Sequence, residues 1–242
     1  MFYHEDRVLF IGAHPDDIEI GAGGTVHRLC TRLNAHVELL ILSYGTRRLS
    51  AALRELSSTP ESNAPAASLR RYDPDSRHGE SITAAQCLGV KEENVHVANE
   101  FEDTRLHLKA HELIRYIEDF VFDARGHARF DAIVTHANGD RHSDHNQVHE
   151  STLAALRYFR GRILCFRSPS SKMNEFAPNH FEIVSEESMA AKLRALGMHA
   201  SQRDKAFMRE AHIRRMASEW TSFLNLQDSL VEQFRVVQSI GA

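Results

Sequence analysis

The chain lacks the cysteine patterns that mark disulfide-rich proteins and zinc knuckles. Its three cysteines, Cys30, Cys87 and Cys165, are far apart and form no CxxC pair. A disulfide framework and a thiolate metal site are therefore poor interpretations of this sequence. Few, scattered cysteines are typical of proteins from a reducing compartment, so we expect a cytoplasmic location.

Long apolar runs are also missing, and we expect no signal peptide. The longest apolar run, VELLIL, is interrupted by Glu38 and is far too short to span a membrane. The first ten residues, MFYHEDRVLF, have mixed charge and lack the apolar core of a signal peptide. We therefore expect no membrane partner.

The charge balance shows no basic excess. The chain has 29 Lys and Arg against 33 Asp and Glu, which gives a net charge of -4. Nucleic-acid binders carry clustered positive charge, so we expect no nucleic-acid partner. With 242 residues, 42% of them hydrophobic, the chain is long enough for one domain over residues 1–242 with a sizeable core.

Short apolar runs alternate with helical patterns along the chain. Runs rich in Val, Ile and Leu predict buried strands at 7–13, 36–43, 94–98, 130–136, 162–166 and 180–184. Helical patterns occupy 23–32, 76–88, 106–124, 144–160, 187–196 and 202–219. This alternation predicts an α/β fold, a Rossmann-like, mostly parallel sheet covered by helices on both faces.

Residues 44–75 do not fit this alternation, because they are rich in Ser, Pro, Arg and Asn. A stretch of that length without regular structure is either a functional lid or a disordered segment. It follows the second predicted strand and therefore leaves the sheet at the same edge as the loop after the first strand. We expect it near the mouth of any site at that edge.

The histidines, 16 in all, include one directly after the first predicted strand, in AHPDD. Ligands bind open α/β sheets at the carboxyl ends of their strands. His14 and Asp17 are three residues apart and can point to one side of a first helical turn, which leaves Asp16 free. This suits two metal ligands and one carboxylate for proton transfer. The alternative is that the acidic residues complement a helix dipole.

A second cluster, THANGDRHSDHNQVHE, follows the predicted strand that ends at His136. Catalytic zinc sites take three His or carboxylate ligands and leave one position for water. His145 can supply the third ligand to the first motif. His142 can face the same pocket without binding metal, and Asp144 can fix its tautomer.

The two motifs together, AHPDDIEIGAGG and HSDH, resemble the PIG-L / LmbE-like family of zinc-dependent de-N-acetylases. Weaker similarities cover most of the remaining chain: Arg77-x-x-Glu80, FEDTRL at 101–106, KLRALGMHASQ at 192–202, and VEQFRV near the end. Two departures stand out. Ile18 replaces an acidic residue often found after the Asp pair, and SYGTRR replaces the usual T-x-G-E after the second strand.

The resemblance implies an amidohydrolase that removes an N-acetyl or similar N-acyl group from an amino sugar or sugar-like conjugate. His14, Asp17 and His145 would hold Zn²⁺, with Fe²⁺ or another divalent metal as alternatives. Asp16 would be the general base for water attack. His142 would stabilise the tetrahedral intermediate, oriented by Asp144.

Further expectations concern the substrate and the assembly. Arg77, Asp103 and His199 are candidates for substrate contact, and a structural salt bridge or cap is an equal alternative for each. The expected partner is a small N-acylated molecule, and the family implies self-association into a homo-oligomer. The competing functions are another single-metal hydrolase, such as a phosphoesterase, and a non-catalytic Rossmann-like binding module. The second of these lacks its G-x-G-x-x-G fingerprint here.

Overall fold

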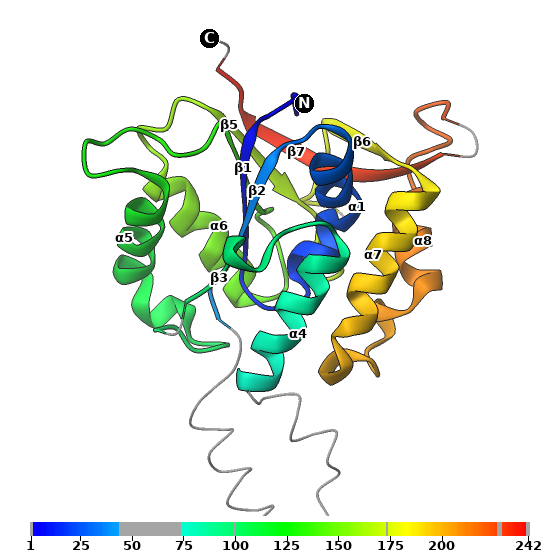
Figure 1. The fold of residues 1–242 in the computed structure, drawn as a ribbon, viewed down its shortest axis with the longest axis horizontal. Coiled ribbons are helices and arrows are strands. Elements are labelled where there is room, and N and C mark those ends of the chain that lie inside the picture. Colours follow the sequence, from blue (N-terminus) through cyan, green and yellow to red (C-terminus); the bar gives the residue numbers. More distant parts are fainter. Residues whose placement is uncertain (1, 44–73, 99, 173, 227–228, 241–242) are drawn as a thin grey trace, which may run out of the picture.

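Strand β1 (Arg7–Gly12) lies near the middle of a seven-stranded sheet, in a computed structural model that describes residues 2–43, 74–98, 100–172, 174–226 and 229–240 (Figure 1). The strand order is β3-β2-β1-β4-β5-β7-β6. The other strands are β2 (His36–Ile41), β3 (Val95–Val97), β4 (Ala132–His136), β5 (Arg162–Phe166), β6 (His180–Val184) and β7 (Leu230–Gln238). Pairing is parallel from β3 to β5, whereas β7 is antiparallel to both β5 and β6.

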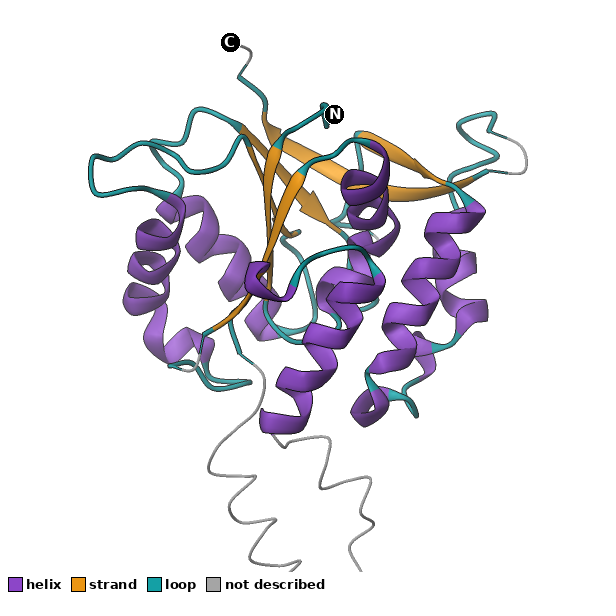
Figure 2. Ribbon diagram, in the orientation of Figure 1, coloured by secondary structure: helices purple, strands orange, loops and turns teal. Residues whose placement is uncertain are grey.

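Helices cover both faces of this sheet, as the sequence predicted (Figure 2). One face carries α1 (Asp17–Arg32), α4 (Pro74–Cys87), α7 (Glu186–Met198) and α8 (Glu210–Ser218); the other carries α5 (Ala110–Val121) and α6 (Ser143–Ala155). Apolar stripes of these helices form the two main cores. Ile18, Ala22 and Val26 of α1 pack on one face, and Leu113 and Ile117 of α5 pack on the other. The fold class is therefore confirmed.

Helix α1 begins at Asp17, six residues before the expected start at residue 23. Its glycines disfavour helix by propensity, but tertiary packing requires them. A Cβ at Gly21 would lie 2.3 Å from the ring of Phe166, and one at Gly24 would lie 2.5 Å from Val184. Glycine thus lets α1 approach β5 and β6 closely.

Other boundaries also differ from the prediction. The expected helix over 202–219 is wrong, because only α8 is α-helical there and the preceding chain forms two short 3₁₀ turns. Strand β7 was not predicted. The segment 44–73, which makes up nearly all of the predicted loop, lies outside the described residues. In the described part of the chain, no helix is long and apolar enough to cross a membrane.

The topology places the two sequence motifs together. Strands β1 and β4 are neighbours, with Val8 opposite Ala132 and Phe10 opposite Val134. Both strands end at the same edge of the sheet, so the β1–α1 turn and the β4–α6 loop leave side by side.

Candidate active site

The β1–α1 turn is held in a strained conformation. Asp16 has φ +91° and ψ -24°, in the left-handed region that a non-glycine residue occupies at a cost of order 1–3 kcal/mol. Two contacts fix the turn. The backbone N–H of His14 donates to Asp17 Oδ2 at 2.8 Å, and Arg77 Nη2 donates to the carbonyl of Pro15 at 3.2 Å. The strained residue is thus Asp16 itself, and the next residue in the turn is Asp17.

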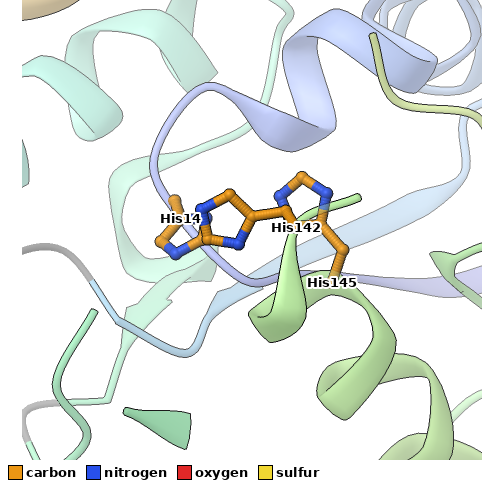
Figure 3. Close-up of side chains that lie close together, drawn as sticks. All are labelled: His14, His142 and His145. Atoms are coloured by element: carbon orange, nitrogen blue, oxygen red, sulfur yellow. The ribbon is translucent and has the colours of Figure 1, made fainter. Parts of the chain in front are cut away.

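The start of α6 supplies two further imidazoles. His142 is the N-cap residue, and its Nδ1 accepts from the backbone N–H of Asp144 at 3.3 Å. In the neutral ring the proton must therefore be on Nε2. The ring of His145 stacks against that of His142, with centroids 4.6 Å apart. Figure 3 shows both rings beside His14, whose centroid is 4.7 Å from that of His142 and 5.5 Å from that of His145.

Asp17 joins the two histidines that we expected to share a metal ion. Its Oδ2 lies 3.3 Å from His14 Nδ1, and its Oδ1 lies 3.3 Å from His145 Nε2. A third imidazole, that of His136, lies 3.2 Å from Oδ2. All four side chains are at least nine-tenths buried. Overlapping sets of three possible ligands, with ligand atoms within 4.8 Å of one another, include His14 with His142 and His145, and Asp17 with His136 and His145.

Each of the two histidines also contacts a carboxylate through its other nitrogen. His14 Nε2 lies 3.1 Å from Asp144 Oδ2 and 3.3 Å from Asp103 Oδ1. His145 Nδ1 lies 3.3 Å from Asp140 Oδ2. Metal-binding histidines characteristically present one nitrogen to the ion and the other to a carboxylate.

The position of Asp144 corrects one expectation. Its carboxylate contacts His14 and accepts from the backbone N–H of Thr104 at 2.6 Å. It does not orient His142, which instead receives the Asp144 backbone N–H. The reason is local geometry, because at the second position of α6 the side chain turns toward His14 and Thr104 while the backbone amide donates to the N-cap residue His142.

Asp140 belongs to the second sequence cluster, THANGDRHSDHNQVHE, but the sequence indicated no role for it. The structure makes it a candidate for supporting His145. Its Oδ1 accepts from Ser170 Oγ at 2.6 Å and from the backbone N–H of His142 at 2.8 Å. Its Oδ2 accepts from Ser171 Oγ at 3.1 Å and also from Ser168 Oγ. The serines belong to the loop after β5, whose sequence, RSPSS, signals a turn but not this contact.

These groups open into a cavity of about 260 Å³, whose described lining is His14, Asp16, Asp17, Ile20, Arg77, Asp103, His142, His145, Pro169, Ser170, Lys205 and Phe207. Arg77 and Asp103 lie in its wall, 3.8 Å apart. His199 does not line it. That imidazole is only 1% exposed and lies 3.4 Å from Glu19, behind the wall where we expected a substrate contact.

Sequence motifs did not indicate Lys205 or Phe207 as lining residues. They lie in and beside the 3₁₀ turn Ala206–Met208, inside the region wrongly predicted as one helix. The Lys205 ammonium lies 5.3 Å from the centroid of the Phe207 ring. Only the tertiary structure brings this turn to the cavity.

The neighbouring carboxylates Asp16 and Asp17 have opposite pKa shifts. Burial, followed by the charge of Asp17, raises the pKa of Asp16 to about 6. Burial would also raise the pKa of Asp17, but the charges of His145 and His136 outweigh it and hold that pKa well below its usual range. Such a divergence within one site separates a proton-accepting group from a permanently ionised one.

The histidines respond in the same way to burial and charge. Burial lowers the pKa of His142, and the nearby His14 and His145 lower it further. Burial acts in the same direction on His145, but contacts with Asp17 and Asp140 reverse it and raise the pKa to about 9. A cation would be expected to displace that proton, because imidazole ligands bind metal in their neutral form.

Comparisons with known proteins agree with this fold. The family model described as PIG-L, GlcNAc-PI de-N-acetylase, matches residues 9–156. The uncharacterized deacetylase YaiS of Escherichia coli K12 is 30% identical over 195 residues, which are 80% of this chain and 90% of YaiS. The chain belongs to the PIG-L family of deacetylases.

Solved structures with the same fold have lower sequence identity. The N,N'-diacetylchitobiose deacetylase of Pyrococcus horikoshii is 19% identical with a TM-score of 0.67, covering 96% of this chain and 84% of that one. GalB, the 4-carboxy-2-hydroxymuconate hydratase of Pseudomonas putida KT2440, is 17% identical with a TM-score of 0.65, covering 98% of both chains. Because the fold is shared by a deacetylase and a hydratase, the fold alone does not set the reaction.

Proposed function

We propose that this deacetylase-family chain is a metal-dependent amidohydrolase that removes an N-acetyl or similar N-acyl group from an amino sugar or sugar-like conjugate. The observation that carries the proposal is the arrangement around Asp17. One carboxylate stands between His14 and His145, and each imidazole is backed by a further carboxylate.

The residues fit a zinc ion in number and type. Two imidazoles and one carboxylate are a usual set for catalytic zinc, which leaves one position for substrate or water. Ligand atoms bound tetrahedrally at ~2.1 Å are about 3.4 Å apart, by simple geometry. The two distances of 3.3 Å from Asp17 to His14 Nδ1 and to His145 Nε2 are close to that spacing, and they end on different oxygens of the carboxylate, Oδ2 and Oδ1. They are longer than good charge-assisted hydrogen bonds.

Zn²⁺ held by His14, Asp17 and His145 would supply a Lewis acid that lowers the pKa of water to about 7 and polarises an amide carbonyl. Asp16 lines the same cavity without a direct place in this ligand set. Its raised pKa suits it to accept a proton from water at neutral pH and to pass that proton to the departing amine. The ionised Asp17 stays a ligand.

His142 is placed to stabilise the developing negative charge. Its Nδ1 is engaged by the Asp144 backbone, so its Nε2 is the atom free to donate a hydrogen bond into the cavity. A neutral donor can act on an oxyanion without first gaining a proton. Removing a donor of this kind costs about 3–4 kcal/mol of transition-state stabilisation.

The substrate class rests on similarity and on the cavity. The Pyrococcus relative acts on N,N'-diacetylchitobiose by its name, and the family model is described as a GlcNAc-PI de-N-acetylase. Arg77 and Asp103 in the wall can contact hydroxyl groups of a sugar.

Fe²⁺ remains an alternative metal, since imidazole and carboxylate suit both ions. The cytoplasmic location and the homo-oligomer stay predictions.

Acetate release from a panel of N-acetylated amino sugars and sugar conjugates tests the proposal. We expect turnover with Zn²⁺, loss of turnover with chelator, recovery on adding metal back, and one metal per chain. Hydrolysis of phosphoesters in place of amides, or two metals per chain, would favour the phosphoesterase alternative. Ligand binding without any turnover would favour the binding module.

A further inference from the structure

A buried ion pair outside the cavity contacts the middle of helix α1. Lys192 of α7 lies 2.6 Å from Glu232 of β7, and the two side chains are only 4% and 3% exposed. Lys192 Nζ also donates to the carbonyl oxygen of Ile20 at 2.8 Å. These residues belong to the late motifs KLRALGMHASQ and VEQFRV, for which the reaction itself gives no role.

Glu232 contacts backbone N–H groups of the same helix. Its Oε1 accepts from the backbone N–H of Gly24 at 2.9 Å, and its Oε2 accepts from that of Thr25 at 2.7 Å. In a regular helix the N–H of residue 24 bonds to the carbonyl of residue 20. Here side chains from two other elements contact both of these groups.

The glycines of α1 allow this close approach. A Cβ at Gly23 would lie 3.1 Å from Lys192 Cγ, and a Cβ at Gly24 would lie 3.3 Å from Glu232 Oε1. The ion pair therefore contacts α1 at the end of its first turn, at the carbonyl of Ile20 and at the N–H groups of Gly24 and Thr25.

A short path connects this ion pair to the candidate active site. Ile20, whose carbonyl receives Lys192, donates its own N–H to the carbonyl of Asp16 at 2.9 Å. Asp16 is the residue with φ +91°, and Asp17 follows it. A strained residue persists only where its surroundings over-determine its conformation.

We propose that Lys192 and Glu232 are positioning residues, which fix the first turn of α1 and so place Asp16 and Asp17 for metal binding and proton transfer. This inference rests on the proposed function. A purely structural pair would raise the stability of the whole fold equally. A positioning pair affects residues 16–20 and the affinity for metal beyond any effect on global stability.

Two variants separate these roles. Lys192→Met alone leaves the Glu232 charge buried without its partner and so lowers stability strongly. The double variant Lys192→Met/Glu232→Leu removes both charges, and such replacements are often neutral in stability. It still deprives the Ile20 carbonyl of its lysine donor and the Gly24 and Thr25 N–H groups of their carboxylate acceptor. The double variant therefore tests position even if the single variant fails to fold.

Arg162→Met is the matched control. Arg162 donates to Asp6 at 2.9 and 2.7 Å, and both side chains are 9% exposed. This pair lies at the amino end of β5, away from the first turn of α1. We expect its loss to lower the melting temperature without changing the affinity for Zn²⁺.

The measurements are hydrogen exchange of the metal-free proteins and Zn²⁺ titration against a chromophoric chelator. We expect exchange in residues 16–20 of the double variant to be about tenfold faster than in wild type, with core strands unchanged. We expect its Zn²⁺ affinity to fall about 10- to 100-fold, the size typical of lost support behind metal ligands. Where wild type turns over substrate, kcat should fall with little change in KM.

Wild-type exchange in residues 16–20 and wild-type Zn²⁺ affinity in a folded double variant would overturn the inference. So would an equal loss of affinity in Arg162→Met. If wild type itself neither binds Zn²⁺ nor releases acetate, the proposed function fails instead. The exchange result still decides whether the pair fixes this turn, because it is measured without metal or substrate.

Discussion

The two ends of the sheet pair their charged side chains in different ways. At the amino ends of the strands, Arg7 pairs with Asp131 at 2.9 Å and Arg162 pairs with Asp6 at 2.7 Å. Each of these carboxylates accepts two hydrogen bonds from one guanidinium group. At the carboxyl ends, Asp17 meets imidazole nitrogens at 3.3, 3.2 and 3.3 Å.

Hydrogen bonding shows the same difference. Among the described residues, His136 Nδ1 and Asp144 Oδ1 are buried without a hydrogen-bond partner. A buried polar atom left in that state costs about 1–3 kcal/mol. The amino end is thus completed by the charges of the protein itself. The carboxyl end gathers more nitrogen and oxygen donors than its own hydrogen bonds use, as a cation site requires.

Removing a proposed metal ligand should have the largest effect. We expect His145→Ala to lose stoichiometric Zn²⁺ and to reduce acetate release to background, because two ligands hold the ion far more weakly than three. Metal content by atomic absorption and acetate release check this. Arg7→Met, at the other end of the sheet, is the control and should keep both. Full metal occupancy in His145→Ala would show that His145 is not a metal ligand.

Asp16→Asn should separate chemistry from metal binding at the same end. The substitution keeps size but removes the proton acceptor, so we expect kcat to fall about 10²- to 10⁴-fold. Zn²⁺ content should stay at one per chain, because Asp16 is outside the proposed ligand set. Undiminished turnover in a variant shown to hold its metal would exclude Asp16 as the base.

Asp140→Asn should weaken the site by a smaller factor. The amide cannot support the His145 imidazole as a carboxylate does, and we expect Zn²⁺ affinity to fall about 10- to 100-fold. Competition with a chelator measures this. Asp131→Asn, which removes a paired carboxylate at the amino end, should leave affinity unaltered. Equal affinities in all three proteins would show that Asp140 serves only the serine loop.

The smallest effect concerns pH at the amino end. A hydrogen bond from Arg7 holds the pKa of Asp131 below its ordinary value. A lowered folded pKa adds stability above the unfolded pKa, near 4, and that stability is lost as pH falls through the folded value. Because Asp131 is 40% exposed, we expect at most about 1 kcal/mol. Urea unfolding of wild type and Asp131→Asn should differ at pH 7 and converge below pH 3.

The sequence was sufficient to predict the fold class and to predict that the AHPDD and HSDH motifs lie at the same edge of the sheet. Apolar runs identified six of the seven strands, and strand ends in an α/β sheet share one edge. That rule alone brings His14 toward His145. It does not require β1 and β4 to be neighbours, which is set by packing across the whole sheet.

Side-chain direction and irregular segments could not be predicted. The carboxylate of Asp144 turns to His14 because of the cap geometry at His142, which depends on a single backbone amide. The start of α1 was predicted six residues too late, and contact with distant strands explains its glycines. Lys205 and Phe207 reach the cavity from a 3₁₀ turn that local pattern did not distinguish from helix.

A crystal structure of the protein grown with Zn²⁺, with anomalous diffraction recorded at the zinc edge, tests the central claim most directly. The account predicts one strong anomalous peak per chain, bonded to His14, Asp17 and His145 at about 2.0–2.2 Å. A peak bound by other side chains, or none at this edge of the sheet in a protein that releases acetate, would contradict it.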